Sequence, residues 1–193
     1  MTAARTRLKG WALTILLASA TSLGMTVGAA AQELSDNADD LLDLLAAEAD
    51  PREAGRLADE VLERWSHSGS AALDLLLRRG EDALLAEDYP RALSHLTALT
   101  DHAPEFAEGW ATRAEAFFMA ERYGAAMADI EQALILEPRH FGALAGLGII
   151  LERLGESEGA LRALRAAQAI YPAEENVAEA IERLEIQTGG RTL

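Results

Sequence analysis

The side chains that most often do chemistry in proteins are few in this chain. It contains no cysteine, which excludes thiol nucleophiles, disulfides and Cys-ligated metals. His95 and His102 are seven residues apart, whereas a zinc-binding helix usually pairs its histidines at i and i+4. Ser94 beside His95 is no triad, because a triad is a spatial arrangement. These two histidines, together with His67 and His140, are predicted to be surface residues.

The acidic and glycine-rich patterns also predict no site of their own. A run of aspartates from residue 36 to residue 43 lacks the ligand spacing and central glycine of a calcium loop. We interpret it as a solvated helix start, where the helix dipole favours acids. Gly142, Gly146 and Gly148 lie inside a predicted helix with no strand before it, unlike a phosphate-binding loop. We therefore predict a protein that is not an enzyme and holds no cofactor or metal.

The overall charge limits the partners. The chain has 193 residues, with 17 basic and 32 acidic side chains and a net charge of −15. Binding to a nucleic acid backbone depends on Lys and Arg that neutralise phosphates, so we expect no nucleic acid partner. After residue 31 the chain is rich in Ala, Leu, Glu and Arg and poor in Val, Ile and Thr, which favours helix over sheet.

The first 31 residues predict a secretory signal peptide. Arg5, Arg7 and Lys9 precede an apolar stretch over residues 11–27, and three alanines end at Ala31. We expect cleavage after Ala31, a periplasmic mature protein and no stable membrane span after cleavage. The alternative is an uncleaved anchor, although the apolar stretch is near the short limit for a spanning helix.

The remaining chain repeats with a period of 34 residues. Pro104, Pro138 and Pro172 have this spacing, and six further columns keep their residue character across the three windows. Two columns are always small: Gly80, Ala114 and Gly148; Ala92, Ala126 and Ala160. A large apolar column is Leu76, Trp110 and Leu144. A period of 20–50 residues is typical of a solenoid.

Each window also predicts two helices. In the middle window, apolar residues from Trp110 to Phe118 step by three and four along one helical face. A break follows at residues 121–124, and the stepping resumes from Met127 to Leu134. Pro138 ends the unit, because proline cannot continue a helix.

This helical hairpin resembles the tetratricopeptide repeat. The middle window carries the residue types of that family at Trp110, Ala114, Phe117, Ala126, Ala133 and Pro138. The third window departs from the pattern, with Leu144 and Leu147 where aromatic residues are common and Ser157 where Tyr89 and Tyr123 stand. The resemblance implies an all-α, right-handed α-solenoid of antiparallel helix pairs.

The repeat period sets the predicted boundaries. We expect a signal peptide, a short linker, a degenerate repeat, three full repeats, a capping helix and a tail, over residues 1–31, 32–38, 39–72, 73–106, 107–140, 141–174, 175–188 and 189–193. In the degenerate repeat, Ala46, Ala58, Leu62 and Trp65 match the columns, whereas Pro51 shortens the first helix to about 38–49. This repeat is expected to cap the N-terminal end of the stack.

The resemblance further implies a binding groove, because the family binds extended peptides or partner helices on the concave face. The first helix of each unit supplies the predicted groove residues Leu77, Glu81, Leu84, Ala111, Glu115, Phe118, Ala145, Ile149 and Glu152. One variant of the family binds the C-terminal carboxylate of a peptide through Lys, Arg and Asn side chains. In this chain the corresponding columns hold Leu, Ala and Glu instead. We therefore expect an apolar partner segment with basic residues. The alternative is that the apolar members are ordinary packing and the acids a solvated face.

The predicted function is a non-catalytic periplasmic scaffold or adaptor that binds a peptide or partner helix of another protein. Residues 52–65, rich in mixed charge, are a candidate outer contact. One alternative is a self-assembling structural module, in which two copies form a homodimer through Ile181, Leu184 and Ile186. Another is an accessory subunit of a cell-envelope enzyme complex.

Overall fold

The computed structural model describes residues 38–189. The predicted signal peptide and nearly all of the predicted linker and tail lie outside these residues. The described part consists of helices and short connections, with a first helix over residues 38–47. The other helices are α2 (Pro51–Trp65), α3 (Ala71–Leu85), α4 (Tyr89–His102), α5 (Ala107–Met119), α6 (Tyr123–Leu136), α7 (Phe141–Arg153), α8 (Ser157–Ile170) and α9 (Glu175–Gly189).

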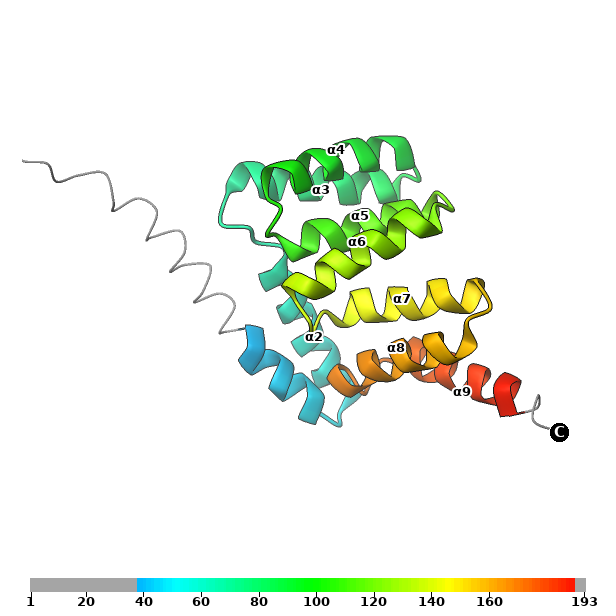
Figure 1. Ribbon diagram of the computed structural model, residues 1–193. Helices are drawn as coiled ribbons and strands as arrows, with labels where there is room; N and C mark the ends of the chain where they lie inside the picture. Colours follow the sequence, from blue (N-terminus) through cyan, green and yellow to red (C-terminus); the bar gives the residue numbers. More distant parts are fainter. Residues whose placement is uncertain (1–37, 190–193) are drawn as a thin grey trace, which may run out of the picture.

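The helices from α3 to α8 form three antiparallel pairs that stack side by side (Figure 1). The pairs α3–α4, α5–α6 and α7–α8 make the largest helix contacts, and α4–α5 and α6–α7 join one pair to the next. The predicted all-α stack of helix pairs is confirmed. Among residues 38–189, none of the helices combines the length and the apolar character needed to cross a membrane.

The turn inside each pair is built in the same way. Glu87, Glu121 and Gly155 are 34 residues apart and have left-handed backbones, with φ of 55°, 58° and 82°. The next amide donates a hydrogen bond back to the helix that has just ended, as from Asp88 to the Ala83 carbonyl at 2.8 Å. This arrangement satisfies carbonyl groups that a helix end leaves unpaired. The period of 34 therefore extends to the backbone angles.

The small columns allow the two helices of a pair to approach closely. Gly80 faces Leu96, and Gly148 faces Leu164. A Cβ atom at position 148 would lie 2.5 Å from Cγ of Leu164, and one at position 80 would lie 2.5 Å from a methyl carbon of Leu96. Such distances are far below van der Waals contact, so only glycine fits this backbone and leucine packing.

A largely buried arginine joins the first two pairs. Arg113 of α5 donates two hydrogen bonds to the Asp129 carboxylate of α6, at 2.7 and 2.8 Å. It donates a third, at 2.6 Å, to the hydroxyl of Thr100 in α4. The Arg113 and Asp129 side chains are only 13% and 7% exposed, and the guanidinium lies 4.7 Å from the Trp110 ring. Bidentate pairing of this kind is geometrically specific and fixes the relative positions of three helices.

The N-terminal hairpin, residues 38–65, lies elsewhere than expected. Its apolar residues Leu42, Leu45, Ala54, Leu57 and Val61 form a separate core with Phe141, Ile170 and Tyr171. The hairpin therefore packs against the start of α7 and the end of α8, and it does not cap the stack at α3. Its first helix spans only 38–47, and the aromatic side chains of Phe141 and Tyr171 supply the apolar surface on which the hairpin packs.

Helix α9 covers the C-terminal end of the stack. Helix α9 packs on α8 and buries Val177, Ala180, Ile181 and Leu184. Leu184 is fully buried and Ile181 is 8% exposed, so neither is available to pair two copies of the chain. The predicted self-assembly surface is wrong in these two residues, and only Ile186, which is 69% exposed, lies on the outside.

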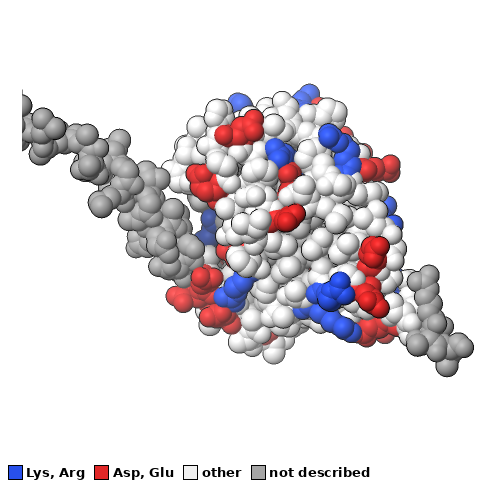
Figure 2. Space-filling model, viewed as in Figure 1, with Lys and Arg blue, Asp and Glu red and all other residues white. Residues whose placement is uncertain are grey.

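The face seen in Figure 2 carries scattered charges. Acidic and basic groups of the described residues lie in small groups separated by broad uncharged areas. The strong negative net charge is therefore not gathered into one patch on this face.

The close approach in the third pair can be tested with Gly148→Ala. We expect the free energy of unfolding to fall by about 1–2 kcal/mol, because the added methyl group displaces Leu164. Gly146→Ala is the matched control in the same helix, since its nearest neighbour would be Ile130 Cδ1 at 3.7 Å. It should gain up to about 1 kcal/mol from helix propensity. Urea denaturation measures both, and equal stability of the two variants would contradict the packing argument.

The buried ion pair can be tested with Asp129→Ala. Removing one partner leaves the Arg113 charge buried and uncompensated, so we expect a loss of about 3–5 kcal/mol in urea denaturation. The double variant Arg113→Met, Asp129→Leu removes both charges and should recover much of that loss. Additive losses in the double variant would show that the two side chains do not act as a pair.

Candidate partner-binding groove

The first helices of the second and third repeats border an open cavity of about 410 Å³, which we call the groove. Its lining comes from α5, from α7 and from Leu62 of α2, together with Ile130 of α6 and His140. Five predicted groove residues are part of it: Ala111, Glu115, Phe118, Ala145 and Ile149. The 34-residue period brings them together, because equivalent positions of successive first helices face the same side of a solenoid.

The middle of the groove is apolar and open to solvent. Phe118 contacts the Tyr123 ring at 5.7 Å between centroids, and the Arg153 guanidinium lies 5.5 Å from the Phe118 ring. These contacts fix the ring at one side of the cavity. Met119 and Ile149 are 45% and 42% exposed. Exposed apolar side chains gathered around a cavity are typical of a binding surface.

Three carboxylates lie toward the N-terminal side of the groove. Glu108 and Glu115 line it, and Glu81 of α3 is close enough to interact with both electrostatically. Desolvation raises the pKa of the Glu115 carboxyl, and the charge of Glu108 raises it further. Desolvation also raises the pKa of Glu81, followed by the charges of Glu108 and Asp82. The groove therefore favours positive charge, which would relieve this repulsion.

His140 holds the acidic and aromatic parts of the site together. Its Nδ1 atom accepts the backbone N–H of Ala143 at 3.1 Å and caps the start of α7. The neutral ring then carries its proton on Nε2, which donates to Glu108 at 3.1 Å. The Trp65 ring of α2 stacks on the imidazole, with centroids 4.5 Å apart. His140 therefore joins α2, α5 and α7.

The comparisons with known proteins agree with this geometry. The sequence profile of the tetratricopeptide repeat matches residues 77–135 and 121–175, which together cover just over half of the chain. A TPR repeat-containing protein of Rhizobium etli is 37% identical over 155 residues, which are 80% of this chain and 76% of that protein.

The chain belongs to the tetratricopeptide repeat family.

Solved structures show the same fold at low sequence identity. The first TPR of Spaghetti (RPAP3), bound to the HSP90 peptide SRMEEVD, is 18% identical with a TM-score of 0.59. That match covers 61% of this chain and 93% of the other. The Yersinia enterocolitica secretion chaperone SycD, in complex with a peptide of the translocator YopD, is 14% identical with a TM-score of 0.58. That match covers 62% of this chain and 96% of the SycD chain.

Four predicted groove residues of this tetratricopeptide protein lie outside the cavity lining. Leu77 is 1% exposed and belongs to the core of the first repeat, where it packs with Leu96 and Leu99 of α4 and with Ala116 of α5. Leu84 packs against the same core. Glu152 accepts hydrogen bonds from Arg183 of α9 at 3.1 and 2.9 Å. Glu81 reaches the groove only through its charge.

The prediction of a surface histidine was wrong for His140, which is 3% exposed. Its place just before a predicted helix start is a typical capping position, and this was the available signal. Its partners Trp65 and Glu108 are distant along the chain, so no local pattern points to them. Among residues 38–189, no group of three or more His, Asp or Glu side chains is placed to hold a metal ion.

The raised pKa of Glu115 predicts a pH-dependent loss of stability. Between its unfolded and folded pKa values the folded state binds more protons, so stability falls as the pH rises through this window. We expect the urea midpoint of Glu115→Gln, relative to the wild type, to increase from about pH 4 to about pH 7. Glu158→Gln, at an exposed position of α8, controls for the loss of one negative charge. An equal pH dependence in both variants would contradict the effect of the groove.

Proposed function

We propose that this chain is a non-catalytic periplasmic adaptor or scaffold that holds a segment of another protein in the groove. The observation that carries the proposal is an open apolar cavity bordered by carboxylates. Its size suits a few side chains of an extended or helical segment. The RPAP3 and SycD structures each contain a bound peptide, which supports peptide binding as the use of this fold.

The charge of the groove selects among peptides. Within residues 38–189, Glu81 and Glu115 make no hydrogen bond or ion pair through their carboxylates. An acidic peptide such as SRMEEVD, with three carboxylate side chains, would be repelled by them. A segment with one or more Lys or Arg beside an apolar residue would match both the acidic and the apolar part. This is the partner chemistry that we propose.

The proposed location rests on the sequence. The basic start, apolar stretch and terminal alanines of residues 1–31 support export to the periplasm. An accessory subunit of a cell-envelope enzyme complex would use the same groove, and the identity of the captured partner distinguishes that role from a general scaffold.

The proposed function is tested by crosslinking and capture from cell envelopes with residues 32–193 as bait. We expect Phe118→Arg with Ile149→Arg to reduce capture of a specific protein by at least about tenfold, because both changes place charge in the apolar part. Ile135→Arg is the control, since Ile135 is 66% exposed on α6 and outside the groove. Circular dichroism establishes that all three forms are folded.

Two results would contradict the proposal. Equal capture by the double variant and the wild type would show that the groove is not the binding surface. A captured protein found only in the cytoplasm, together with retention of the full chain there, would refute the periplasmic location.

A further inference from the structure

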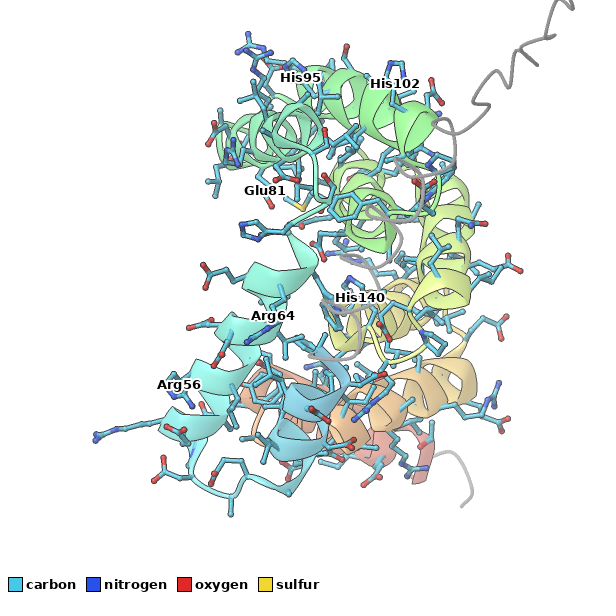
Figure 3. The ribbon with its side chains drawn as sticks, turned by 90° about the vertical axis from the view of Figure 1, so that its left-hand side faces the viewer. Arg56, Arg64, Glu81, His95, His102 and His140 are labelled. Carbon is cyan, nitrogen blue, oxygen red and sulfur yellow. The ribbon has the colours of Figure 1, made fainter. Side chains whose placement is uncertain are left out.

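Helix α2 borders the groove from the side opposite to the repeats. It runs alongside the stack, with Arg56 and Arg64 on it and His140 between it and the repeat helices (Figure 3). Leu62 of α2 lines the cavity together with Phe118 and Ile149. Leu62 is 39% exposed, so its side chain contributes apolar surface to the cavity without being buried itself.

Helix α2 does not act as a plug. A segment of the chain that blocked the groove would fill it with its own apolar side chains. Instead Ala54, Leu57, Ala58 and Val61 are buried in the core of the N-terminal hairpin. The cavity of about 410 Å³ stays open beside them. The space between α2 and the repeats is therefore available to another molecule.

The N-terminal hairpin is attached firmly enough to hold α2 in this position. Trp65 stacks on His140 and lies 5.4 Å from the Phe141 ring, at one end of α2. From the residue next to His140, Arg139 pairs with Asp43 at 2.8 Å and with Asp39 at 3.7 Å, both in the first helix of the hairpin. The apolar core of the hairpin, shared with α7 and α8, adds to these contacts. Aromatic stacking and apolar burial supply most of the attachment, because exposed ion pairs contribute little.

We propose that α2 is the second wall of the binding site, so that a basic amphipathic segment of a partner protein is held between α2 and helices α5 and α7. This inference rests on the proposed function. An apolar side chain of the segment contacts Leu62, Phe118 and Ile149, and an adjacent Lys or Arg lies against Glu115. Contact on two sides buries more apolar surface of the segment than an open concave face would.

The charge of the chain argues against a second copy as the occupant. The chain carries a net charge of −15, and the groove itself is bordered by Glu81, Glu108 and Glu115. Inserting an acidic segment of an identical chain would bring like charges together. A cationic partner segment is favoured by the same charges.

The test uses residues 32–193 and a short amidated probe peptide of leucine and lysine that forms an amphipathic helix, with affinity measured by calorimetry. We expect Leu62→Asp to weaken binding by about tenfold. Leu44→Asp is the matched control, because Leu44 is 57% exposed on the same hairpin and does not line the groove. A peptide with glutamate in place of each lysine should not bind.

Hydrogen exchange tests whether α2 contacts the bound peptide or is displaced by it. Peptide binding should slow exchange of the amides of residues 51–65 if α2 contacts the peptide. Trp65→Ala should speed peptide release, whereas Trp65→Phe should restore slow release because it keeps an aromatic ring against His140. Faster exchange in α2 on binding, or tighter binding by Trp65→Ala, would show that α2 is displaced and would overturn the inference.

The failures of the two proposals differ. If Phe118→Arg abolishes peptide binding while Leu62→Asp and Leu44→Asp both leave it unchanged, the groove binds peptides without α2, and only this inference is refuted. If the wild type does not bind the lysine peptide, the proposed partner chemistry and this inference fail together.

Discussion

The close contact between the two helices of each pair is the constraint on which the rest of the structure depends. Gly80 and Gly148 bring the facing backbones within reach of Leu96 and Leu164, and Ala114 occupies the equivalent position in the middle pair. A single pair has apolar residues on faces that it cannot bury alone, so neighbouring pairs must stack. Stacking then aligns the first helices, and their aligned faces form the groove. The groove thus depends on the glycine–leucine contacts inside the helix pairs, because these contacts determine how the first helices are arranged.

Much of this could be predicted from the sequence because the relevant interactions are local and repeated. A period of 34 residues gave the helix pairs, and the column positions gave five residues of the groove. The groove position predicted for Leu77 is wrong because a repeat column predicts which way a side chain points but not how deeply it is buried: Leu77 lies in the core of the first repeat. The contacts of His140 and the position of the N-terminal hairpin could not be predicted, since they join segments without a shared period.

Charge is distributed in two different ways in this acidic protein. Within the second repeat, Asp129 is buried but fully matched by Arg113, which makes the pair a fixed structural element. At the groove, Glu115 lies in apolar surroundings without such a partner. Its pKa is raised because desolvation disfavours the charged carboxylate. The first arrangement contributes a specific geometry to the fold. The second leaves an electrostatic preference that a bound cation would satisfy.

The return of the N-terminal hairpin to α7 and α8 has a consequence for how the chain folds. A simple helical solenoid has contacts only between neighbours, so folding can start anywhere and spread along it. Here Arg139 contacts Asp39, which is 100 residues away in the sequence, and the core of the hairpin needs Phe141 and Tyr171. The N-terminal hairpin is synthesised before α7 and α8, so it can complete its packing only after they have formed. We expect this long loop closure to slow the last step of folding and to couple the unfolding of the hairpin to that of α7 and α8.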